Sequence, residues 1–257
     1  MSHTLGVRQA QKQKTRRALL DAGLRLLEDQ SLSSLGLREV TRVVGVAPAA
    51  FYRHFRDMSD LGVALVEESL GSLHGVVRVI LAERDGGEQL IDATVEAVAE
   101  LVRGYPAHIR FIARERHGGV RPVREAIAAE LGRFADEVAE AFAPQLMAEG
   151  WSLEDVRMLA ELYVDHMVMT ATAFLEAQPG EPSGAQSGEP SGARPGDPGA
   201  GAQSGAQPGD QSGDQPEAQL AQPGEGAGDP EAVRRVAATA RRQLLLISLG
   251  RRHWRTG

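Results

Sequence analysis

The residues from Gly45 to Phe55, GVAPAAFYRHF, bring together side chains that can bind a polyanion. Tyr52, Arg53 and His54 are consecutive, and the stretch contains three aromatic residues although aromatic residues make up only 4% of the chain. A phenol, a guanidinium and an imidazole can each donate hydrogen bonds to phosphate oxygens. These residue types therefore indicate contact with nucleic acid, provided that a helix presents them to solvent.

A helix-turn-helix over residues 37–55 is the element expected to position these side chains. Gly45 can adopt the left-handed conformation that turns the chain, and Pro48 is suited to the first turn of the following helix. Phe51 and Phe55 are four residues apart, so they share one helix face and can pack inward. In the helix-turn-helix, the second helix enters the major groove of DNA. A plain helical hairpin with a buried aromatic pair would give the same spacing.

The net charge of −7 is distributed unevenly. Residues 178–230 contain eight acidic residues and one basic residue, which account for the whole net charge, whereas residues 1–20 contain five basic residues and no acidic one. Local charge steers a protein toward a polyanion more than total charge does. We therefore expect Lys12, Lys14 and Arg16 to contact the DNA backbone from an N-terminal arm and helix.

Several classes of function lack the residues that they need. The chain has no cysteine, no G-x-S-x-G, no glycine-rich phosphate loop after a strand and no paired metal-ligand spacing. We therefore expect no enzyme activity, no cofactor and no metal site. The sequence also shows no apolar run of the roughly 18 residues that span a membrane and no secretory signal, so we expect a cytoplasmic protein without membrane contact.

The segment 178–230 differs in composition from the rest of the chain. Its 53 residues hold 13 of the 29 glycines and 9 of the 13 prolines, with Leu220 as the one large aliphatic residue. Such a segment buries too little apolar surface to offset the entropy of ordering it. We expect a disordered insertion that loops out to solvent.

The remaining sequence predicts an all-α fold of about nine helices. Ser59 is expected to cap a long helix, and Ser152 with Asp155 has the spacing of a capping box. We predict a DNA-binding domain at residues 1–58 and a helical effector-binding and dimerisation domain at 59–257, interrupted by the insertion. The expected helices cover residues 15–29, 37–44, 48–54, 60–84, 88–103, 107–116, 122–142, 153–176 and 231–254.

The head resembles the TetR family of bacterial transcriptional regulators. The resemblance is carried by KTRRALLDAGLRLLED at 14–29 and LREVTRVVGVAPAAFYRHFRDMSDL at 37–61. Segments at 6–23, 37–69, 109–119 and 241–254 further resemble the FabR/DesT-type repressors of unsaturated fatty acid biosynthesis. The resemblance implies a homodimer that binds a palindromic double-stranded DNA operator, with a small hydrophobic effector such as a long-chain acyl-CoA or acyl carrier protein thioester.

The same resemblance assigns roles to individual residues. It implies DNA contacts from the residues of the helix-turn-helix, namely Arg38, Pro48, Ala49, Ala50, Tyr52, Arg53 and His54. This sequence departs from the family pattern at Gly36, where a Ser or Thr cap is usual, and at Met58, where a lysine often contacts phosphate. Ala49 and Ala50 replace hydroxyl residues, so their methyl groups can meet only apolar features such as a thymine methyl.

Candidate effector residues lie in the second domain. Apolar walls are expected from Phe111, Phe134, Tyr163 and Met167, all at helical spacing. Arg114 and Arg116 can meet the anionic end of an acyl thioester; alternatively, they form an ion-paired hinge between head and body at a helix end. The arginines of the last helix have two interpretations, a second nucleic-acid patch or a solvated face.

Two classes of DNA-binding protein fit these observations. One is a repressor whose operator affinity depends on an effector. That effector is either an acyl thioester or, if the protein regulates efflux or catabolic genes, a different small hydrophobic molecule. The other is a constitutive DNA-binding protein without an effector. A body without a cavity would favour the second class.

Overall fold

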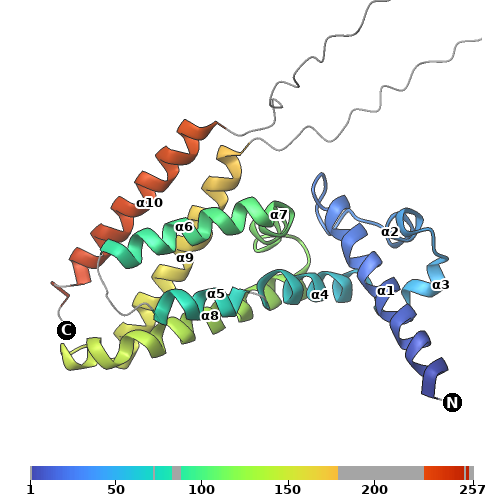
Figure 1. The fold of residues 1–257 in the computed structure, drawn as a ribbon, viewed down its shortest axis with the longest axis horizontal. Coiled ribbons are helices and arrows are strands. Elements are labelled where there is room, and N and C mark those ends of the chain that lie inside the picture. The colour runs from blue at the N-terminus through green and yellow to red at the C-terminus, as the bar shows by residue number, and fades with distance from the viewer. Residues whose placement is uncertain (1, 72, 83–87, 179–228, 252, 255–257) are drawn as a thin grey trace, which may run out of the picture.

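The computed structural model describes residues 2–71, 73–82, 88–178, 229–251 and 253–254, and within these ranges every regular element is a helix. Figure 1 shows an elongated molecule with a small N-terminal head at one side and a larger helical body. The all-α fold expected from the sequence is confirmed. The helices are α1 (Ser2–Leu26), α2 (Leu37–Val44), α3 (Pro48–Phe51), α4 (Met58–Gly71), α5 (Leu73–Ala82), α6 (Glu88–Gly104), α7 (Pro106–Glu115), α8 (Arg121–Ala148), α9 (Leu153–Ala177) and α10 (Pro230–Arg251).

The described residues form ten helices where the sequence predicted nine, because the helix expected at 60–84 is described as α4 and α5 on either side of residue 72. The N-terminal segment is part of α1 from Ser2 onward, so the expected basic arm is helical. Most of the glycine- and proline-rich insertion, residues 179–228, lies outside the described residues.

Two helix starts were predicted from capping residues, with different outcomes. The capping box is confirmed, since the Ser152 hydroxyl accepts the Asp155 N–H at 3.1 Å and donates to the Asp155 carboxylate at 2.6 Å. The cap predicted at Ser59 is wrong. Asp57 takes that place, because its carboxylate accepts the N–H of Asp60 at 2.8 Å and α4 already begins at Met58.

The head and the near end of the body share one hydrophobic core. It extends from Leu19 of α1 through Phe51 and Phe55 to Leu65 of α4 and Ile127 of α8. Burial of these side chains against one another ties the position of the head to the packing of α4 and α8. Head and body are therefore mechanically connected.

The body is built around the pair α8 and α9: α8 runs alongside α4 and α5, and α9 crosses toward α6 and α10 (Figure 1). The last helix, α10, packs against α6 and α9. Two further apolar clusters fill this region, one around Phe174 between α6, α9 and α10, and one around Trp151 and Leu159 between α8 and α9. Among the described helices, none combines the length and apolar character required to cross a bilayer.

Candidate nucleic-acid interface and effector cavity

The turn between α2 and α3 has the geometry expected for a helix-turn-helix. Gly45 has φ 74° and ψ 30°, in the left-handed region, and its N–H points at the carbonyls of Thr41 and Arg42. The N–H of Val46 also bonds the Thr41 carbonyl, at 3.0 Å. A side chain with a Cβ is disfavoured in this conformation, which explains the glycine. Pro48 then occupies the first turn of α3.

The aromatic residues of α3 divide between core and surface as the sequence predicted. Phe51 and Phe55 are buried, with ring centroids 5.4 Å apart. Tyr52 is 63% exposed and stands edge-on to Phe51, with centroids 5.9 Å apart. The helix itself is shorter than the expected 48–54, ending at Phe51 and continuing as a turn. The buried pair holds the phenol in a position where its hydroxyl faces solvent.

Arg16 makes a structural contact rather than extending freely into solvent. Its guanidinium lies 4.5 Å from the centre of the Phe55 ring and donates to the His54 carbonyl at 3.2 Å. Arg16 thus joins α1 to the end of the recognition segment. Lys12 and Lys14, from the same predicted set, are exposed on α1.

The imidazole of His54 lies in a positively charged environment. Partial burial lowers the pKa of His54, and the nearby charges of Lys12, Arg16 and Arg53 lower it further. The neutral ring is therefore favoured in the free protein. An anion beside the ring would reverse this preference, because opposite charge stabilises the imidazolium.

The other head residues assigned by resemblance lie on the same exposed part of the head. Arg38, Pro48, Ala49 and Arg53 are exposed, and Ala50 is half-buried. Gly36 is the N-cap of α2 without a side-chain cap bond, as its departure from the family pattern suggested. The structure thus brings together a basic and aromatic surface over α2 and α3, which has the charge needed to contact DNA phosphates.

The body contains a cavity of about 600 Å³, to which helices α4 to α10 all contribute side chains. Its size falls within the range of about 300–1,000 Å³ typical of small-molecule sites. Phe134, Tyr163 and Met167 from the predicted set line it. Phe111 does not: it is buried in the core that joins head and body.

Helix α7 separates the cavity from the head. Ile109, Ile112 and Ala113 line the cavity. On the side facing the head, Arg110 pairs with Glu28 at 3.2 Å. One helix therefore contacts both the cavity and the head.

Arg114 binds the C-terminal end of α1 instead of the cavity. Its guanidinium donates to the backbone carbonyls of Leu27 at 2.8 Å, Gln30 at 2.7 Å and Glu28 at 3.1 Å. All three carbonyls lie in the turn that follows α1, which ends at Leu26. The hinge alternative from the sequence describes this geometry, and the effector role expected for Arg114 has no support in it.

Two neighbours of Arg114 complete the junction. The buried Glu115 carboxylate accepts the N–H of Leu32 at 2.9 Å, which ties α7 to the loop after α1. Arg116, also predicted as an effector contact, instead pairs with Asp165 of α9 at 3.0 Å and does not line the cavity.

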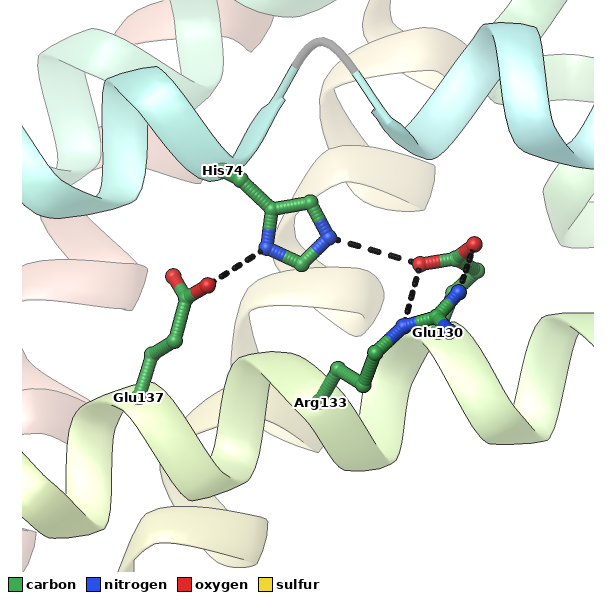
Figure 2. A network of polar contacts seen from close by, with 4 residues as sticks. All are labelled: His74, Glu130, Arg133 and Glu137. Carbon is green, nitrogen blue, oxygen red and sulfur yellow. Dashed lines mark hydrogen bonds and ion pairs between the residues drawn. The ribbon is translucent and has the colours of Figure 1, made fainter.

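A polar network lies behind one wall of the cavity (Figure 2). His74 of α5 contacts Glu137 at 2.8 Å and Glu130 at 3.3 Å, and Arg133 also binds Glu130. The imidazole stacks on Phe134, with ring centroids 4.2 Å apart. The network therefore fixes both α5 against α8 and the orientation of a cavity-lining ring. In the described part of the chain, no group of His, Asp and Glu is arranged to hold a metal ion.

Sequence reasoning missed Arg251, which it had placed among the arginines of a nucleic-acid patch or a solvated face. This residue lines the cavity from α10, near Tyr163 of α9. Burial raises the pKa of Tyr163, and the charge of Arg251 opposes that rise. The phenol thus stays protonated and can donate a hydrogen bond. No local pattern distinguished Arg251 from the other arginines of its helix.

Comparison with known proteins agrees with this geometry. Residues 19–65 match the family model described as bacterial regulatory proteins, tetR family. The part of the head from α1 to α4 is thus similar to that family. An HTH-type transcriptional regulator of Haemophilus influenzae is 41% identical over 136 residues, which are 52% of this chain and 66% of the relative. The chain thus spans slightly less than two thirds of that relative's length.

Two solved structures share the fold. The fatty acid degradation regulator FadR from Bacillus halodurans aligns with a TM-score of 0.53 at 15% identity, over 63% of this chain and 84% of its own. A TetR-family transcriptional regulator from Syntrophomonas wolfei aligns with a TM-score of 0.52 at 13% identity, over 63% and 84% of the two chains. At this identity the likeness concerns the fold, a helix-turn-helix head on a helical body.

Proposed function

We propose that this protein is a transcriptional repressor whose affinity for a palindromic DNA operator depends on a small hydrophobic effector. The observation that carries the proposal is the double role of α7. Ile112 and Ala113 line an apolar cavity, while the adjoining Arg114 holds the end of α1. A ligand that displaces α7 must therefore change how the head is held, which couples the two binding equilibria.

The resemblance to FabR/DesT-type repressors supports an effector with a long acyl chain, as in acyl-CoA or acyl carrier protein thioesters, and regulation of fatty acid genes. The predominantly apolar lining agrees with an acyl chain. The cavity also favours an effector-dependent regulator over a constitutive DNA-binding protein, because a constitutive protein needs no internal space of this size.

Exposed apolar side chains on α9 and α10 support a homodimer. Met158, Leu162 and Met169 lie along one side of α9, and Leu246 and Leu249 lie on α10. Several exposed apolar side chains on two helices that pack together favour an interaction site there. A two-fold axis through such a surface would pair the two heads, as a palindromic operator requires.

The test is selection of bound duplexes from fragmented genomic DNA by the full-length protein, followed by fluorescence anisotropy at fixed salt. The selection should return a palindrome whose half-sites are about 34–36 Å apart. The affinity for that duplex should change when a long-chain lipid is added, either a free acid (oleate or palmitate) or its CoA thioester. Absence of any enriched sequence would refute the proposal, and an operator affinity that no lipid changes would leave only a constitutive DNA-binding protein.

A further inference from the structure

The wall of the cavity includes a half-buried arginine, Arg251, whose Nε–H is buried without a partner. The Nε of Arg251 is inaccessible to solvent and has no hydrogen-bond partner among the described residues. A buried N–H of a charged group that lacks an acceptor is costly, so native proteins rarely leave one unmatched. Its position on the cavity wall indicates that the missing acceptor belongs to a ligand.

The chemistry of that acceptor follows from the guanidinium. Arg presents a planar fork of N–H donors that matches a carboxylate, and the pairing is stronger in a site from which water is excluded. Ser248 lies three residues earlier on α10 and also lines the cavity, on the same helix face. Together with the protonated phenol of Tyr163, these groups offer a polar corner of hydrogen-bond donors.

The number of charges limits the headgroup. Arg251 is the one charged side chain among the described residues that line the cavity. A coenzyme A headgroup carries several phosphate charges, and the single cation of the cavity can pair with only one of them. A headgroup with one negative charge matches the site.

The polar corner lies far from the head. Arg251 is at the end of α10 and Gln145 is near the end of α8, on the side of the body opposite α1 to α3 (Figure 1). Toward the head, the lining is apolar and comes from Leu70 of α4 and Ile112 of α7. A molecule anchored at Arg251 would extend its apolar part toward the helix that holds the head.

We propose that the effector is a free long-chain monocarboxylic acid, whose carboxylate pairs with Arg251 and whose hydrocarbon chain extends toward α7. This rests on the proposed function and specifies its effector as an acid rather than a thioester. The chain end acts on α7, and the carboxylate fixes the depth at which the chain sits. Ligand length therefore determines whether α7 is displaced.

The test measures displacement of the neutral dye Nile red from the full-length protein without DNA. The competitors are tetradecanoate, tetradecanol and myristoyl-CoA, all below their micellar concentrations. We expect tetradecanoate to bind about tenfold or more tightly than tetradecanol, the size of effect that a charge-assisted hydrogen bond gives. Arg251→Gln should abolish that preference while leaving the affinity for tetradecanol unchanged, and Arg251→Lys should retain part of it.

Arg234→Gln is the matched control, since it removes the same charge from an exposed position of α10. It should leave all three affinities unchanged. Equal binding of acid and alcohol, or tight binding of myristoyl-CoA that Arg251→Gln does not weaken, would overturn the headgroup assignment. In either case, a lipid-dependent change in operator affinity would leave the proposed function intact. Loss of that change with every lipid would overturn the proposed function itself.

Discussion

Arg114 and Leu27, 87 residues apart in the sequence, are joined by a hydrogen bond of 2.8 Å from the guanidinium to the backbone carbonyl. The same side chain also binds the carbonyls of Glu28 and Gln30. Its neighbour Ala113 lines the effector cavity. The contact thus places the end of the first head helix one residue away from the cavity wall.

We predict that Arg114→Ala weakens the coupling between effector and operator. The three carbonyls lose their donor, and α7 stays tied to the segment after α1 by the Arg110–Glu28 ion pair and the Glu115–Leu32 hydrogen bond. The ratio of operator affinities with and without lipid should move toward one, while lipid binding to the isolated protein is unchanged. Because the side chain is exposed, the free energy of unfolding should fall by only about 1 kcal/mol. Anisotropy and urea denaturation measure the two effects.

Arg116→Ala provides the comparison for this variant. It removes the same charge from the end of the same helix, but its partner, Asp165, belongs to the body. Coupling should therefore persist in Arg116→Ala. If both variants lost the lipid response equally, a general loosening of α7 rather than the Arg114 contact would be responsible.

The exposed side chains of the turn that follows α3 should contribute to operator affinity without contributing to folding. Tyr52→Phe retains the ring that packs on Phe51 and removes only the hydroxyl. His54→Ala removes the imidazole but leaves the backbone carbonyl that Arg16 binds. Each loss of a phosphate contact should weaken binding about two- to tenfold per subunit. Unaltered operator affinity in the double variant, with an unaltered melting temperature, would exclude α3 as the recognition helix.

Local patterns were sufficient to predict the head, since Gly45, Pro48 and the pair Phe51 and Phe55 each act within one turn of helix. Long-range contacts could not be predicted in this way. Arg114 and Arg251 are both arginines near helix ends; the sequence indicated Arg114 for the effector site, whereas Arg251 is the one that lines the cavity. Which of them faces the cavity depends on how seven helices pack, and no spacing within one helix encodes that arrangement.

Gly62 marks the closest approach of α4 to its neighbours. A Cβ at this position would overlap the Leu32 side chain and come within 2.7 Å of Val123. Gly62→Ala should therefore force the head loop and α8 apart and lower the free energy of unfolding by about 1–3 kcal/mol. Gly132→Ala in the interior of α8 meets open space, so it should instead stabilise by about 0.5–1 kcal/mol. Urea denaturation of the two variants should show opposite signs.

The stability of the protein should fall at mildly acidic pH. Burial lowers the pKa of His166, and a hydrogen bond with the Ala240 backbone opposes that effect. The folded protein thus favours the neutral ring, whereas the unfolded chain takes up a proton near pH 6.5. Stability from this residue is complete above about pH 6.5 and declines as the pH falls below it. Unfolding midpoints in urea at pH 7.5 and 5.5 measure the decline.

His166→Gln should make the midpoint less dependent on pH, since glutamine can keep the hydrogen bond but cannot be protonated in this range. Part of the dependence should persist, because the pKa values of His54 and His108 are lowered as well. A pH dependence identical to that of the unsubstituted protein would show that His166 is not the principal titrating group.

The surface formed by α9 and α10 should hold the dimer together. Leu162 is 50% exposed on α9 and Leu246 is 68% exposed on α10, so Lys at both positions would place charges in an apolar interface. The double variant should elute as a monomer in size-exclusion chromatography with light scattering, and its operator affinity should fall steeply because one subunit reaches only one half-site. Leu153→Lys is the control, since Leu153 is 64% exposed but lies half a turn away on α9. A dimer that survived the double substitution but dissociated on Leu153→Lys would place the interface on the opposite side of α9.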